Sequence, residues 1–238
     1  METAQGVFYG IGVGPGDPEL LTVKAINAIK ISEVIIAPKT EKKSDSLALT
    51  IAEPYLRQGA QIVYQTFPMV KDFETSPEVF EANVAEILSY LREGKIVGFL
   101  TLGDPMFFST YIYIFRLLKK FGVQIETVAG VPAFLAIAAK IGYPVAYGNE
   151  ILSIIPATAD NEKISAALKS ADDVVLMKVY KNFGEVAQIL KNENLTENAV
   201  LVSRCGLEDE KIIADIVSCK NEKLNYLSTI LTRKNQKS

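Results

Sequence analysis

Val7-Phe-Tyr-Gly-Ile-Gly-Val-Gly-Pro-Gly-Asp-Pro-Glu-Leu-Leu-Thr22 combines a strand, a turn and a helix start in one short stretch. The run Val7–Val13 is rich in residues that favour β-strands. The glycines near its end allow the backbone to turn tightly or to approach a ligand closely. Asp17 is a favoured N-cap residue and Pro18 a favoured first helical residue, so the stretch predicts a helix that begins at about Asp17.

A second turn of this kind lies at Gly103-Asp-Pro105 and also follows an apolar run, Ile96–Leu102. The two turns differ in the sequence around them, so they do not indicate an internal repeat. Two glycine turns that each follow a strand predict one shared site.

Strand-like and helix-like segments alternate through the first half of the chain. The expected strands are Val7–Val13, Val34–Ala37, Gln61–Phe67, Ile96–Leu102 and Gln124–Val128, and the expected helices are about Asp17–Ile31, Ser44–Arg57, Pro77–Glu93 and Phe107–Phe121. This alternation predicts an α/β fold with a mainly parallel sheet and helices on both faces. Ligands of such sheets bind beyond the carboxyl ends of the strands, where both glycine turns are expected.

The second half of the chain has shorter helices and ends in a series of strands, which predicts a mixed sheet. Its expected strands are Ile151–Ile155, Asp173–Val179, Ala199–Arg204, Lys211–Ile216 and Tyr226–Thr232, and its expected helices are about Pro132–Ile141, Asn161–Lys169 and Phe183–Lys191. We place a boundary near Gly130, which gives two α/β domains, 1–130 and 131–238.

Composition excludes several classes of function. The 238 residues suit one large or two small domains. A net charge of −3 argues against a general nucleic-acid-binding protein. The chain shows neither a bilayer-spanning apolar run nor the features of a signal peptide, so we expect a cytoplasmic protein without a membrane partner. In that compartment Cys205 and Cys219 are expected to be unpaired thiols.

The chain contains no histidine. This excludes a Ser-His-Asp triad, a Cys-His pair and a histidine-ligated zinc ion, and no other metal-ligand set is visible. Two nucleotide motifs also fail: Pro15 or Asp17 occupies the last glycine position of G-x-G-x-x-G, and no Gly-Lys-Ser/Thr follows the turn.

Three blocks in fixed order carry a resemblance to a known family. They are Gly12-Val-Gly-Pro-Gly-Asp-Pro-Glu-Leu-Leu-Thr22, Gly103-Asp-Pro-Met-Phe-Phe-Ser-Thr110 and Glu126-Thr-Val-Ala-Gly-Val-Pro-Ala133. In order and spacing the chain resembles the tetrapyrrole methylase superfamily along nearly its whole length. Within it, the second block, extended to Tyr113, and Tyr226-Leu-Ser-Thr-Ile-Leu231 most resemble the carbon-20 methyltransferases of precorrin-2 or cobalt-factor II in cobalamin synthesis.

The resemblance implies an S-adenosylmethionine-dependent enzyme that holds the cofactor in a cleft between two α/β domains, and it implies a homodimer. The cofactor-binding residues that it implies are Pro15, Gly103, Asp104, Met106, Pro132, Ala133, Met177, Cys205 and Ser228. Ala129-Gly-Val-Pro132 departs from the family, which often has Ser or Thr after Pro-Gly-Val/Ile, so a hydroxyl contact usual for the family is not expected at Pro132.

Methyl transfer from a sulfonium to an electron-rich ring carbon needs alignment and exclusion of water but no protein nucleophile. A chain without histidine can therefore perform it. The ring carbon must also lose a proton. By residue type Asp104, Glu150 and Tyr111 are candidate acceptors, and no catalytic residue is assigned among them.

The implied tetrapyrrole substrate carries several carboxylates, which favour charge-assisted hydrogen bonds from local cations. Lys39, Lys178 and Arg204 stand at the ends of expected strands and are predicted to bind these carboxylates. Tyr111 is predicted to contact the substrate as well, although its helical spacing from Phe107 and Phe115 is also typical of packing against the sheet.

Three alternatives remain open at this stage. The enzyme could methylate another ring position, or an acceptor that is not a tetrapyrrole, such as a modified protein histidine or an RNA nucleotide. The same fold could also serve as a non-catalytic nucleotide-binding domain. Labelled cofactor with a panel of acceptors would distinguish the first two, and cofactor binding without turnover would favour the third.

Overall fold

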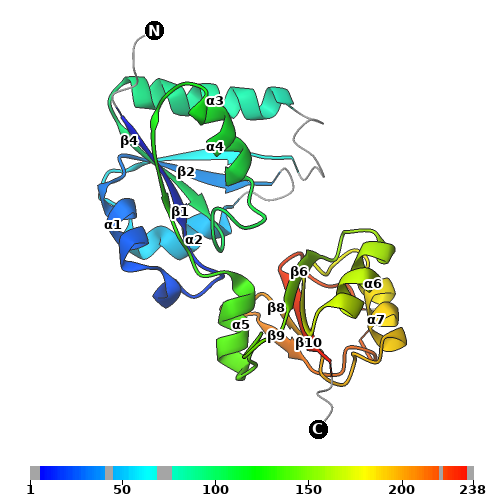
Figure 1. The fold of residues 1–238 in the computed structure, drawn as a ribbon. Coiled ribbons are helices and arrows are strands. Elements are labelled where there is room, and N and C mark those ends of the chain that lie inside the picture. Colours follow the sequence, from blue (N-terminus) through cyan, green and yellow to red (C-terminus); the bar gives the residue numbers. More distant parts are fainter. Residues whose placement is uncertain (1–5, 41–44, 69–76, 220–221, 235–238) are drawn as a thin grey trace. The chain divides into compact units, whose positions relative to one another are not determined.

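The computed structural model describes residues 6–40, 45–68, 77–219 and 222–234. The chain divides into two compact units, Met1–Pro132 and Ala133–Ser238. Each unit contains one five-stranded sheet (Figure 1). Within the described ranges, no helix combines the length and the apolar character needed to cross a membrane.

The sheet of the first unit is entirely parallel, with the strand order β3-β2-β4-β1-β5. Its strands are β1 (Val7–Gly12), β2 (Val34–Lys39), β3 (Gln61–Thr66), β4 (Ile96–Thr101) and β5 (Gln124–Val128). Its helices are η1 (Pro18–Leu20), α1 (Val23–Ile31), α2 (Leu47–Ala52), η2 (Glu53–Tyr55), α3 (Pro77–Arg92) and α4 (Tyr111–Lys119). This architecture confirms the predicted parallel sheet.

Each face of this sheet packs against its own pair of helices (Figure 1). Successive strand side chains point to opposite faces, so Val34 and Ile36 pack with α3 and α4, while Ile35 packs with α1 and α2. All three side chains are buried. Strands that are buried on both faces read as continuous apolar runs, as the sequence showed.

The order of the strands creates a switch point between β1 and β4. The connection from β1 leads through α1 to β2, whereas the connection from β4 leads through α4 to β5 on the other side of β1. These connections cross opposite faces of the sheet and therefore diverge at the carboxyl ends of β1 and β4. In doubly wound sheets, ligands bind at this place.

The second unit has the mixed sheet that the sequence predicted, with the order β6-β7-β10-β8-β9. Its strands are β6 (Leu152–Pro156), β7 (Asp173–Met177), β8 (Val200–Ser203), β9 (Lys211–Ile213) and β10 (Ser228–Arg233), and its helices are α5 (Ala133–Ile141), α6 (Asn161–Ser170) and α7 (Phe183–Asn192). Because β10 is antiparallel to β7 and β8, its start lies at the same edge as their carboxyl ends.

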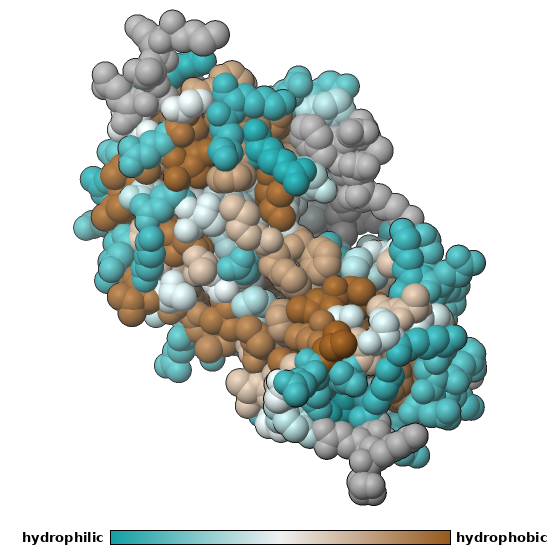
Figure 2. All heavy atoms as spheres, viewed as in Figure 1, coloured by the Kyte–Doolittle hydropathy of each residue, from teal (hydrophilic) through white to brown (hydrophobic). Residues whose placement is uncertain are grey.

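Helices α6 and α7 cover one face of the second sheet. Their buried residues, including Ile164, Leu168, Phe183 and Leu190, pack on Leu176 and other strand residues in one core. The outer surface of these helices is mostly hydrophilic (Figure 2). The helices are therefore amphipathic, and α5 contacts the same sheet through β10.

Two predicted helix starts are wrong. Asp17 does act as an N-cap, accepting a hydrogen bond from Glu19 N at 2.9 Å, but it caps only the short η1 turn. Helix α1 begins later, after Thr22, whose hydroxyl accepts from Ala25 N at 3.1 Å. Helix α4 begins at Tyr111 because Phe108 has a left-handed backbone, with φ of 49°, that a right-handed helix excludes.

One strand is shorter than predicted. The sequence predicts a strand over Lys211–Ile216, but β9 ends at Ile213.

Candidate functional site

Three loops of the first unit meet at the carboxyl ends of β1, β4 and β5. Gly14 and Gly103 exchange backbone hydrogen bonds, with Gly103 N to Gly14 O at 2.7 Å and Gly14 N to Gly103 O at 3.3 Å. Gly130 packs so closely that a Cβ there would lie 2.1 Å from the carbonyl oxygen of Gly103. Only glycine fits at position 130, and the three loops form one rigid backbone cluster.

Asp104 joins two of these loops through its carboxylate. Oδ1 accepts a hydrogen bond from Met106 N at 2.8 Å, and Oδ2 accepts one from Gly130 N at 3.0 Å. Asp104 does not cap α4, whose N-cap position is Thr110. The carboxylate therefore links two loops and fixes the shape of the cluster.

Gly103 borders open space in this cluster. Its φ is +71°, and a Cβ built on it would meet no atom within 4 Å. Pro15 is buried in the neighbouring β1 loop, whereas Met106, two residues after Asp104, is exposed. The arrangement leaves room for a ligand against the backbone of Gly103, as a cofactor site at this position requires.

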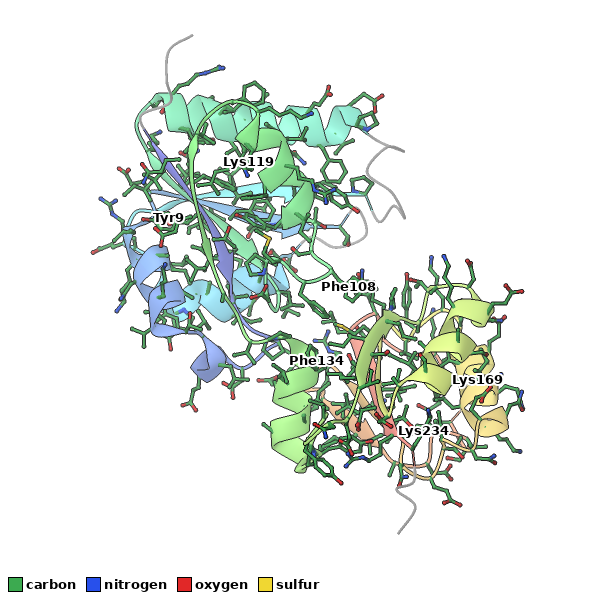
Figure 3. All side chains as sticks on the ribbon, viewed as in Figure 1. Tyr9, Phe108, Lys119, Phe134, Lys169 and Lys234 are labelled. Atoms are coloured by element: carbon green, nitrogen blue, oxygen red, sulfur yellow. The ribbon has the colours of Figure 1, made fainter. Side chains whose placement is uncertain are left out.

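Lys39 ends β2 at the same edge of the sheet. Its carbonyl accepts a hydrogen bond from Phe67 N at 3.0 Å, and its ammonium lies 5.6 Å from the ring centre of Tyr64. The loop before α4 presents a further apolar side chain, Phe108, which is exposed (Figure 3). The sequence did not single out Phe108 as a site residue because it was assigned to a helix.

Tyr111 is a core residue, which contradicts its predicted contact with substrate and its candidacy as a proton acceptor. Its side chain is completely buried among Phe8, Phe99 and Phe115. Its hydroxyl lies 2.6 Å from the hydroxyl of Thr127. Burial of the phenol raises the pKa of Tyr111. The tyrosine packs under Gly10, where a Cβ would lie 2.1 Å from the ring.

Five of the predicted site residues lie together at one edge of the second sheet. They are Met177 and Lys178 at the end of β7, Arg204 and Cys205 after β8, and Ser228 at the start of β10. The Ser228 hydroxyl is buried, 2.7 Å from the carbonyl of Asn225 and 3.0 Å from the Ser203 hydroxyl. Neither Cys205 nor Cys219 forms a disulfide, and Cys205 is buried.

Lys178 and Arg204 share an unusual backbone conformation. Their φ values are 60° and 57°, in the left-handed region that non-glycine residues rarely adopt. The amide of Arg204 is held by a 2.8 Å hydrogen bond to Leu227 O, and the amide of Val179 by a 3.0 Å bond to Ser228 O. Two cations with the same constrained backbone therefore follow β7 and β8, the two strands that flank β10.

Tyr180 and Tyr226 are two residues at this edge that the sequence analysis missed. Their rings lie 5.1 Å apart, edge to face, and the Lys178 ammonium lies 5.9 Å from the ring centre of Tyr226. Tyr226 was assigned to the last predicted strand. Its place two residues before Ser228, a predicted cofactor residue, was the available signal.

Pro132 and Ala133 are the last residue of the first unit and the first residue of the second, and Ala133 begins α5. The predicted cofactor residues therefore come from both units. Within the described residues there is no group of three or more His, Cys, Asp or Glu side chains that could hold a metal ion.

Glu150 lies at the opposite edge of the second sheet from Met177. Its Oε2 accepts from Arg233 Nη2 at 3.1 Å, and the same nitrogen lies 3.3 Å from Asp173 Oδ1 at the start of β7. The Arg233 guanidinium also lies 5.4 Å from the ring centre of Tyr147. This position excludes Glu150 from the site at the carboxyl ends of the strands.

The match to one protein family covers the three loops of the first unit and most of the second-unit edge, although Ser228 lies beyond it. The family model described as Tetrapyrrole (Corrin/Porphyrin) Methylases matches residues 7–218. The chain belongs to this family.

Individual relatives and a solved structure show which members of the family this chain resembles. The chain is 36% identical over 232 residues to a cobalt-precorrin-2 C(20)-methyltransferase of Salmonella typhimurium, covering 96% of this chain and 97% of the relative. It is 36% identical over 216 residues to a probable cobalt-precorrin-2 C(20)-methyltransferase of Methanocaldococcus jannaschii, covering 86% and 85%. A crystal structure of the uroporphyrin-III C-methyltransferase of Thermus thermophilus, complexed with S-adenosylhomocysteine, has the same fold, with a TM-score of 0.69 at 22% identity over 95% of this chain and 97% of that chain.

Proposed function

We propose that the chain is an S-adenosylmethionine-dependent methyltransferase that methylates carbon 20 of cobalt-factor II or precorrin-2 in cobalamin biosynthesis. The observation that carries this proposal is the 36% identity, along 96% of the chain, to a relative with that activity in its name. Both relatives described above are named for the cobalt-bound substrate, which favours the cobalt form.

The residues of the first unit fit such a cofactor. The open space at Gly103 admits a ligand against the backbone, and the carboxylate of Asp104 holds the loop in the required shape. S-adenosylmethionine supplies a methyl group on a sulfonium centre. The residues proposed to hold it are Pro15, Gly103, Met106 and Pro132 of the first unit, with Ala133, Met177, Cys205 and Ser228 of the second unit.

The substrate would be held by cations at the two sheet edges. A polycarboxylate is not attracted by the overall charge of −3, so local groups must bind it. Lys39, Lys178 and Arg204 supply these charges at strand ends. The cobalt ion belongs to the substrate, since the macrocycle carries it.

The protein residues contribute binding, orientation and the exclusion of water. Holding the acceptor carbon in line with the methyl donor can lower the barrier by roughly 7–11 kcal/mol without a protein nucleophile. This agrees with a chain that has no histidine.

The test is a product assay with methyl-labelled S-adenosylmethionine and cobalt-factor II. Mass spectrometry should show one added methyl group, and carbon NMR should place the label at C-20. Metal-free factor II and uroporphyrinogen III serve as competing acceptors. Label at another position, or on only one of these competitors, would contradict the proposed substrate, and cofactor binding without turnover on any macrocycle would favour a non-catalytic domain.

We also propose that the enzyme works in the cytoplasm as a homodimer. Light scattering on the purified chain tests the second part, because a mass of twice 26.1 kDa is expected.

A further inference from the structure

The connection between β8 and β9, residues 204–210, has a fixed backbone. Arg204 N donates to Leu227 O at 2.8 Å, Leu207 N donates to Arg204 O at 3.1 Å, and Glu210 N donates to Leu207 O at 3.0 Å. The left-handed φ values of Arg204 and Gly206 fold the connection back on itself. The Cα of Arg204 is therefore held in one place at the edge of the sheet.

Glu210 anchors this connection to the rest of the second unit. Its Oε2 accepts from Gly206 N at 2.6 Å, and its Oε1 lies 2.6 Å from the ammonium of Lys140 on α5. Burial raises the pKa of Glu210, but the hydrogen bonds from Lys140 and Gly206 outweigh it and leave the pKa below its usual value. Glu210 is thus a stable carboxylate that fixes the backbone but does not touch the Arg204 guanidinium.

The side chain of Arg204 has a separate partner. Its Nε donates to Oδ1 of Asp209, and this hydrogen bond lowers the pKa of the Asp209 carboxyl. Among the described residues, the structure gives the two terminal amino groups of Arg204 no partner. The guanidinium is held along one edge while its other edge, formed by both terminal nitrogens, stays available.

We propose that Asp209 is a positioning residue for substrate recognition: it holds Arg204 by Nε so that the terminal N–H groups face a carboxylate of the tetrapyrrole. This inference rests on the proposed function. Two parallel N–H···O bonds from guanidinium to carboxylate require a defined orientation of the planar group. An arginine that is already ordered loses less side-chain freedom when the substrate binds.

Geometry favours positioning over competition. A carboxylate that competed with the substrate would occupy the terminal nitrogens, which are the bidentate edge. Asp209 instead uses the inner nitrogen, and its own side chain is 62% exposed.

The experiment measures binding of cobalt-factor II to the full chain in the presence of saturating S-adenosylhomocysteine. Asp209→Ala should raise the Kd for cobalt-factor II roughly fivefold, because the arginine must then be ordered on binding. The Kd for S-adenosylhomocysteine and the melting temperature should not change. Asp209→Asn should restore most of the affinity, because its amide oxygen can still accept from Nε.

Two further variants complete the design. Glu208→Ala removes a neighbouring exposed carboxylate that the structure does not pair with Arg204, so it should leave both Kd values at the wild-type level. In an Arg204→Ala background, Asp209→Ala should add nothing, since the positioned group is gone.

Three results would overturn the inference. An unchanged Kd for Asp209→Ala would show a plain surface ion pair, and a lower Kd would show that Asp209 competes with the substrate. A wild-type chain that binds S-adenosylhomocysteine but not cobalt-factor II would overturn the proposed substrate as well, which separates that failure from the failure of Asp209 alone.

Discussion

At the scale of single residues, Asp104 shows how one carboxylate can hold two loops together. One of its oxygens accepts a hydrogen bond from Met106 N and the other accepts one from Gly130 N. The second bond ties the loop after β4 to the loop after β5. The sequence offered two roles for it, a helix cap or a cofactor contact. The structure gives it a third, a link between two loops.

Asp104→Ala should therefore weaken both the fold and the site. Loss of two charge-assisted bonds should lower the free energy of unfolding by about 2 kcal/mol, and the loosened Gly130 loop should lower affinity for S-adenosylhomocysteine at least tenfold. Calorimetry and thermal melting measure the two effects. Asp17→Ala is the control, because Asp17 accepts one bond within its own η1 turn; equal loss of affinity in both variants would contradict a specific role for Asp104.

Asp173 is a second residue whose surroundings decide its behaviour. Its side chain is 2% exposed, and burial raises its pKa from 3.8 to about 6 although Arg233 opposes the shift. Glu150 and Asp172 nearby raise the pKa further.

The sign of the stability effect follows from proton binding. Between pH 4 and pH 6 the folded protein holds a proton on Asp173 that the unfolded chain has released, so the free energy of unfolding falls as the pH rises. Asp173→Asn removes this titration, and over the same range its stability relative to wild type should increase by roughly 2 kcal/mol. Urea unfolding of both chains at pH 4, 5, 6 and 7 measures it. A difference that stays constant with pH would show that Asp173 is ionised throughout.

At the scale of elements, two glycine turns with the same left-handed backbone allow the cost of backbone strain to be distinguished from the loss of a ligand contact. Gly103 has φ of +71° and open space around its Cβ position, and Gly122, in the turn after α4, has φ of +66° and open space as well. Alanine at either position costs about 1–2 kcal/mol because of the left-handed backbone.

The pair Gly103→Ala and Gly122→Ala should therefore lose similar stability but differ in binding. Only the methyl group at position 103 enters the space proposed for the cofactor, so only that variant should lose affinity for S-adenosylhomocysteine, by tenfold or more. Isothermal titration with both variants provides the test. Wild-type affinity in Gly103→Ala would place the cofactor elsewhere.

Most elements could be predicted from sequence because their signals are local. The strand β1 and its glycine turn follow from composition, and buried strands such as β2 follow from continuous apolar runs. Helix starts were harder. The predicted helix from Asp17 is interrupted at Leu21 and Thr22, because Thr22 is the N-cap of α1. Both Asp17 and Thr22 are favoured N-cap residue types, and nothing local in the sequence favours Thr22 over Asp17 as the start of the long helix.

Tertiary contacts decided the errors at the site. Phe108 adopts a left-handed backbone that its residue type disfavours, so no propensity could place it outside a helix. Tyr111, on α4, carries a polar hydroxyl, but the partner of this hydroxyl, Thr127, lies on β5. By contrast, Lys178 and Arg204 were predicted at strand ends because strand ends can be read from sequence, while the Asp209 partner of Arg204 could not.

At the scale of the whole molecule, the net charge of the chain bears most directly on how the proposed substrate binds. The chain carries 25 basic and 28 acidic side chains, so a ligand with several carboxylates is repelled on average. Its binding must then depend on a few cations at short range. Short-range pairs of partly buried groups are screened less by salt than long-range attraction is.

Lys178→Ala and Arg204→Ala should each raise the KM for cobalt-factor II while leaving the affinity for S-adenosylhomocysteine nearly unchanged. Loss of one charge-assisted contact predicts about a tenfold effect in each case. Lys169→Ala is the matched control, because it also removes one positive charge. Lys169 lies on α6, and its ammonium pairs with Glu193 and not with a group at the strand ends (Figure 3). If overall charge governed binding, all three variants would weaken it equally. If Lys178 and Arg204 bind the carboxylates directly, Lys169→Ala keeps the wild-type KM, and the double variant loses more than either single one.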